Sequence, residues 1–87
     1  MPYIKKEDKQ KYEKVLSPMM FIPIETPGEL NFLVTYLCNM YRGAHGNSYK
    51  IYNDIIGVLE CAKLEMYRRK VSGYEDAKIV ENGDVYN

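Results

Sequence analysis

Apolar residues recur every three or four positions through the middle of the chain, which is the spacing of one helix face. The first such stripe predicts a helix over about 27–42, ended by Gly43 and Gly46. Thr26 and Glu29 have the spacing of a capping box, and Pro27 suits the first helical position. This helix therefore has both a predicted start and a predicted apolar face.

A second stripe predicts a longer helix over about 48–71, capped by Asn47 or Ser48 and ending before Gly73. Five of its residues alternate at steps of three and four, which is the spacing of a coiled-coil seam. Other apolar residues lie outside this seam, so we expect the helix to contact both its own chain and another subunit. The seam, a candidate oligomer interface, consists of Tyr52, Ile55, Leu59, Ala62 and Met66.

The segment before the first long helix is less regular. Residues 6–16 have a helix-favouring composition but few apolar positions, so we expect a short surface helix there. The apolar run at 19–24 is broken by Pro23 and predicts a loop that the fold or a partner must cover. The candidate interface residues of this loop are Met20, Phe21 and Ile22.

The C-terminal residues 74–87 form a separate short unit in the pattern. Asn82-Gly83 is a strong signal for a tight turn, which predicts a short hairpin with arms near 78–81 and 84–87, or else an extended tail. A lone hairpin of this size is marginally stable, so we expect residues 74–87 to dock on this subunit or on a neighbour.

Together these elements predict an all-α fold, a small helical bundle in one domain over residues 1–87. A chain of this length buries only about 60% of its surface, so an additional subunit would add useful stability. Nine tyrosines suit partly buried interface positions. We therefore expect a homo-oligomer, at least a dimer.

The net charge of the chain limits which kinds of partner it can attract. The 12 basic and 12 acidic residues give a formal net charge of zero, so no long-range attraction to nucleic acid or anionic lipid is expected. The sequence has no long apolar run for a membrane span, and its charged start lacks a signal core. The pattern predicts a cytoplasmic protein with no membrane partner and little affinity for nucleic acid.

The usual catalytic and metal-binding patterns are missing. His45 is the only histidine, and Cys38 and Cys61 lie within helical patterns without zinc spacing. No serine has a nucleophile-elbow context, and no glycine-rich phosphate loop is present. The sequence therefore predicts no metal, no cofactor and no catalytic residue, which indicates that the protein is not an enzyme.

The acidic residues of the long helix leave one catalytic alternative open. All-α nucleotide pyrophosphohydrolases bind Mg²⁺ through carboxylates on neighbouring helices, and Glu60 and Glu65 could contribute to such a site across a dimer. The simpler interpretation is a set of helix-surface ion pairs. These pairs would be Glu65 with Arg68 or Arg69, Glu60 with Lys63, and Lys50 with Asp54.

The end of the long helix combines three cations with tyrosines. Positive charge stabilises a helix C-terminus by itself. The same residue types also bind phosphate and stack on a base, which would suit a small nucleotide-like anion. The candidate ligand-binding residues are Tyr67, Arg68, Arg69, Lys70 and Tyr74.

Four distinctive stretches are spread along the chain: MPYIKKED, TPGELNF, IGVLECAKLEMYRR and the ending YED-KI-ENGDVY. Together they resemble a family of small phage-associated proteins. The resemblance is weakest at residues 15–25 and 42–48. The family has no assigned activity, so the resemblance transfers no site residue; it implies a phage accessory protein in the host cytoplasm.

Three functions remain open on the sequence. The first is a non-catalytic oligomer that binds a host protein, and the second is an oligomer that sequesters a small nucleotide-like ligand as a counter-defence protein. The third is the pyrophosphohydrolase-like enzyme, and a weak nucleic-acid binder is a further alternative.

Overall fold

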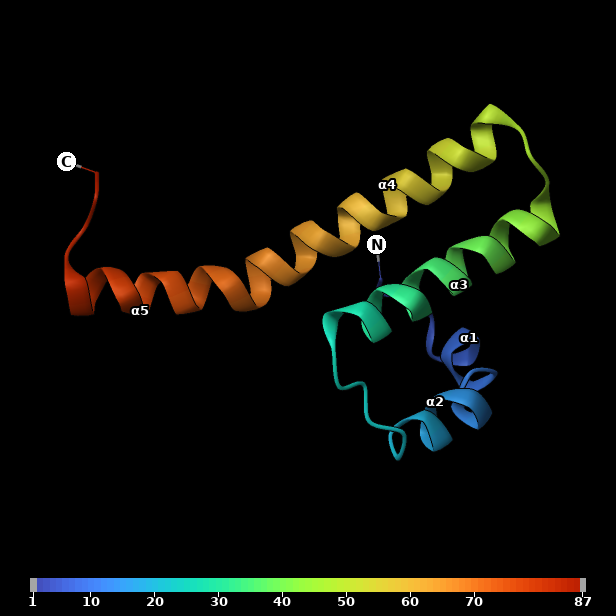
Figure 1. The fold of residues 1–87 in the computed structure, drawn as a ribbon, viewed down its shortest axis with the longest axis horizontal. Helices are drawn as coiled ribbons and strands as arrows, with labels where there is room; N and C mark the ends of the chain where they lie inside the picture. The colour runs from blue at the N-terminus through green and yellow to red at the C-terminus, as the bar shows by residue number, and fades with distance from the viewer. Residues whose placement is uncertain (1, 87) are drawn as a thin grey trace. The chain divides into compact units, whose positions relative to one another are not determined.

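The structure, a computed structural model, describes residues 2–86; Met1 and Asn87, the ends of the predicted domain, lie outside the described residues. The fold is all-α, as predicted, and the described residues contain no strand (Figure 1). The elements are α1 (Lys6–Gln10), α2 (Glu13–Met19), α3 (Pro27–His45), α4 (Tyr49–Met66), the π-helical turn η1 (Tyr67–Val71) and α5 (Ser72–Asn82).

The predicted N-terminal helix over 6–16 is two short helices, α1 and α2, separated by a turn at Lys11 and Tyr12. The apolar spacing is too sparse to hold one continuous helix against a second layer. The structure also extends α2 beyond the predicted end, through Pro18. Proline removes one donor, but the next turn still closes because the Met20 N–H donates to the Leu16 carbonyl at 3.2 Å.

Helix α3 begins at the predicted cap. The Glu29 N–H donates to Thr26 Oγ1 at 3.1 Å, and the Thr26 hydroxyl donates to the Glu29 carboxylate at 3.1 Å. The Glu29 side chain thus meets the cap hydroxyl rather than the cap amide expected of a capping box. The helix passes Gly43 and ends at His45, because of the two predicted glycines it is Gly46 that has the positive φ, 107°, that turns the chain away.

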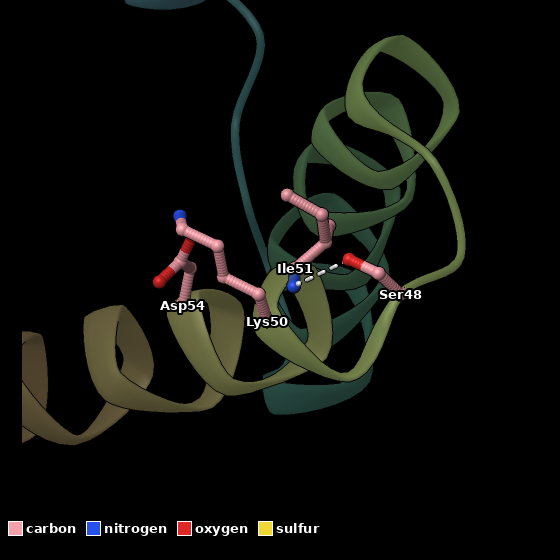
Figure 2. Close-up of polar contacts among 4 residues, drawn as sticks. All are labelled: Ser48, Lys50, Ile51 and Asp54. Atoms are coloured by element: carbon pink, nitrogen blue, oxygen red, sulfur yellow. Dashed lines mark hydrogen bonds and ion pairs between the residues drawn. The ribbon is translucent and has the colours of Figure 1, made fainter.

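Helix α4 begins after Ser48, one of the two predicted caps. The Ile51 N–H donates to Ser48 Oγ at 3.3 Å, and Lys50 Nζ lies 2.8 Å from a carboxylate oxygen of Asp54, one turn further along the helix (Figure 2). The Ser48 hydroxyl shares this donor with the Ser48 carbonyl, which accepts the Ile51 N–H at 3.1 Å, and both contacts fall at the first turn, where a cap stabilises the helix start.

The predicted C-terminal hairpin is wrong. The chain stays helical past Gly73, through η1 and α5, because glycine in a helix costs only about 1 kcal/mol relative to alanine. The Asn82-Gly83 pair ends this helix instead: Gly83 has a φ of 89°, and its N–H donates to the Ile79 carbonyl at 2.8 Å. A positive φ serves a helix end as well as a hairpin turn.

The described residues have almost no interior. Ile51, with 8% of its surface exposed, is their only buried residue. The contacts divide the chain into two units, one up to Ile55 and one from Ile56 onward. Within residues 2–86 no helix combines the length and the apolar character needed to cross a membrane.

Candidate functional site

The predicted seam is present as one face of helix α4. Its five residues keep their spacing of three and four because α4 is uninterrupted over this stretch. Leu59 is 37% exposed, Met66 is 59% exposed and Ile55 is half-buried. Large apolar side chains at this spacing are therefore available to another helix, and their use between subunits stays a prediction.

The π-helical turn η1 changes the side on which the following residues lie. The Ser72 N–H donates to the Tyr67 carbonyl, five residues back instead of four. One extra residue in a turn shifts all later side chains by about 100° relative to a continuous α-helix. As a result, Val71 and Tyr74 follow Met66 on the side of the seam, and Val71 is half-buried.

The same turn carries four of the five predicted ligand-binding residues, from Tyr67 to Lys70, and the fifth, Tyr74, lies in α5. The Tyr67 hydroxyl donates to Glu75 Oε1 at 2.7 Å. This hydrogen bond, and then the negative charge of Glu75, raise the pKa of Tyr67 above its ordinary value. The contact joins η1 to α5, so the hydroxyl of Tyr67 already has a partner within the chain.

The cations of this cluster differ from one another. Arg68 lies 3.1 Å from a Glu65 carboxylate oxygen, as the ion-pair interpretation predicts. Arg69 and Lys70 are exposed and form no ion pair among residues 2–86. Tyr74 faces a cation of its own helix, because Lys78 Nζ lies 5.6 Å from its ring centroid. Within the predicted cluster, Arg69 and Lys70 are thus the two cations that no ion pair among residues 2–86 holds.

The acidic residues of α4 lie in the predicted ion pairs. Glu60 pairs with Lys63 at 3.0 Å, and the Lys50–Asp54 pair raises the pKa of Lys50 through its hydrogen bond. Among residues 2–86, no group of three or more histidine, cysteine or acidic residues is arranged to hold a metal ion. These contacts are those of ordinary helix-surface pairs.

An apolar groove in the N-terminal unit is a feature that the sequence analysis did not predict. It consists of two adjoining hollows of about 680 Å³ and about 560 Å³ that share Met19 and Ile24. The signal was the apolar run near Pro23, whose predicted cover is missing within the unit, since Met20 and Phe21 are 85% and 86% exposed. The first hollow is lined by Met19, Ile22, Pro23, Ile24, Thr26, Gly28, Glu29, Phe32 and Leu33, and the second by Glu13, Leu16, Ser17, Met19, Met20 and Ile24.

Comparison with known proteins gives one match. A family model described as a domain of unknown function (DUF6899) matches residues 1–85. No curated protein and no solved structure matches this chain.

Proposed function

Because that match spans nearly its whole length, the chain belongs to the DUF6899 family, a domain of unknown function, and we propose that it acts without catalysis, by binding. In this proposal, copies of the chain associate through their exposed helix faces, and the resulting oligomer binds a partner protein. The observation that carries the proposal is the lack of an interior in the described chain.

The chain contains many more apolar residues than it buries by itself. The sequence is 46% hydrophobic, a globular proportion, yet Ile51 is the only buried residue that the structure describes. Ordering the backbone costs about 1–2 kcal/mol per residue, and apolar burial is the main term that offsets it. Association supplies that burial when the chain alone does not.

The second unit shows this need by itself. From Ile56 to Asn82 the chain is a succession of helical segments, and no other element of the unit covers them. Most helix stability in proteins comes from packing an apolar face rather than from helix propensity, so these segments lack their main source of stability until another surface covers them. The seam on α4 provides such a face at the spacing used between paired helices.

Sedimentation over a range of protein concentrations tests the proposal. We expect at least a dimer for the natural chain, and a dissociation constant raised about tenfold or more in Leu59→Glu or Met66→Glu, because each places a charge in the seam. Asn53→Glu is the matched control, since Asn53 is exposed on the opposite side of α4 at about 100° per residue. A natural chain that stays monomeric at high concentration would contradict the proposal.

The biological setting belongs to the same proposal. The resemblance of the MPYIKKED, TPGELNF and IGVLECAKLEMYRR stretches to phage-associated proteins supports a role as a phage accessory protein in the host cytoplasm. Deleting the gene from a phage that carries it should lower replication in some hosts and leave particle structure unchanged. Altered particles from the deletion phage would assign the protein to the virion instead.

A second candidate function is the sequestration of a small nucleotide-like anion. Arg69 and Lys70 favour it, because both are exposed in η1 without an ion pair among the described residues, and π-helical turns are frequent at functional sites. Calorimetric titration with cyclic and linear nucleotides tests it, with Arg69→Ala and Lys70→Ala as variants. The absence of binding across the panel would remove this candidate.

A further inference from the structure

The apolar groove of the N-terminal unit has a consistent charge along its length. The only charged residue that lines the first hollow is Glu29, and the only one that lines the second is Glu13. No lysine or arginine lines either hollow. The groove is therefore apolar in the middle and negative at two places along its wall.

Both carboxylates have capacity for a further contact. Glu29 accepts the Thr26 hydroxyl through Oε2 alone, and no ion pair of Glu29 or Glu13 occurs among residues 2–86. A cationic side chain of a partner would form an exposed ion pair with either carboxylate. Such a pair favours a positively charged partner over a negatively charged one, but it adds little affinity. Affinity must come from the apolar walls.

The walls suit large apolar side chains. Each hollow lies within the range of about 300–1,000 Å³ that is typical of ligand-binding clefts. Met19 lines both hollows, and Met20 lines the second, so polarizable and flexible side chains shape the groove. Two hollows side by side fit two apolar anchors of one segment, as when an amphipathic helix binds in a groove.

We propose that this groove binds a cationic amphipathic segment of a partner protein, with two large apolar side chains in the hollows and lysine or arginine beside Glu13 and Glu29. The assignment rests on the proposed binding function and names its site and the chemistry of its partner. The apolar hollows determine that the partner segment binds through large apolar side chains. The two carboxylates determine that the residues flanking those side chains are positively charged.

Fluorescence anisotropy with synthetic peptides tests the assignment on the full chain. The probe is a short helical peptide with two leucines one turn apart and lysines on its flanks. One comparison peptide replaces the lysines with glutamates, and another replaces the leucines with serines. We expect the cationic, leucine-containing peptide to bind about tenfold or more tightly than either comparison peptide, which corresponds to about 1.4 kcal/mol.

Variants of the chain localise the binding. Phe32→Ala removes part of the wall of the first hollow and should weaken binding of the cationic peptide severalfold. Glu13→Gln and Glu29→Gln should each weaken it by about 1.4- to 5-fold, the range for one exposed ion pair. Glutamine keeps a capping acceptor at position 29, and Glu81→Gln on α5 is the matched control that should change nothing.

The opposite results overturn the assignment. Equal binding of the acidic peptide removes the role of the carboxylates, and unchanged binding by Phe32→Ala places the peptide elsewhere. Tighter binding of a peptide spanning residues 64–76 of this chain assigns the groove to a second copy. Absence of peptide binding by a chain that still sediments as an oligomer refutes this site alone, whereas a monomeric chain refutes the proposed function.

Discussion

At the residue scale, the phenol of Tyr67 and the amine of Lys50 are the two described groups whose pKa the fold raises, and the Tyr67 contact joins η1 to α5. Its hydrogen bond to Glu75, at 2.7 Å, and the charge of Glu75 raise the pKa of Tyr67 above 10.0. A raised pKa means that the contact stabilises the folded state at neutral pH, and that this stabilisation is lost as the pH rises through the raised value. Glu75→Gln should therefore return the pKa of Tyr67 toward 10.0.

Carbon-13 NMR of labelled tyrosine against pH measures this pKa, and Tyr67→Phe identifies the resonance. Asp76→Asn is the control, since Asp76 is the neighbouring carboxylate and does not accept the Tyr67 hydrogen bond. An unchanged titration in Glu75→Gln would show that the contact does not persist in solution.

At the element scale, the start of α3 depends on one side chain. Thr26→Ala removes the acceptor of the Glu29 N–H and should lower the free energy of unfolding by about 1 kcal/mol, measured by urea denaturation at one protein concentration. Thr26→Ser should keep most of the stability. Thr35→Ala tests a threonine of the same helix whose hydroxyl contacts only the Asn31 side chain, and it should cost far less.

The π-helical turn η1 gives a second prediction at this scale. Because the turn holds one extra residue, deleting Arg69 leaves Met66 and Val71 four apart in a continuous α-helix, on the same side as before. Self-association should survive this deletion. Deleting Lys63 from α4 rotates Met66 and the residues after it by about 100° relative to the rest of the seam and should weaken association, as followed by sedimentation. Equal loss from both deletions would contradict a seam that continues through η1.

At the scale of the whole molecule, folding and association should be coupled. In the proposed oligomer, a chain that buries only Ile51 among its described residues would gain most of its apolar burial from its neighbours. The midpoint of thermal unfolding should therefore rise with protein concentration, as circular dichroism can show. Leu59→Glu should lose this dependence, while Asn53→Glu should keep it. A concentration-independent midpoint for the natural chain would mean that one copy folds alone.

Local signals predicted the long helices well. The Thr26 and Ser48 caps mark the starts of α3 and α4, and the ion pairs Glu60–Lys63 and Glu65–Arg68 follow from spacing alone. Such features depend on residues within one turn of each other, so the sequence contains the information directly.

The errors came from signals with two structural meanings. Asn82-Gly83 supplies a positive φ, which ends a helix as readily as it turns a hairpin, and Gly73 lowers helix stability without stopping the helix. The groove was missed for a different reason. It forms where the 19–26 segment meets the start of α3, and the path of that segment has no local periodic signal.

The exposure of single apolar side chains affects the steady-state amount of this protein in a cell. Met20, Phe21 and Val80 are each at least 85% exposed, so a newly made copy presents adhesive surface before it meets any partner. Chaperones and proteases act on such surfaces, so in the proposed assembly the copies without a partner should be removed first. The steady-state amount of the protein should then follow the supply of its binding partners rather than its own rate of synthesis.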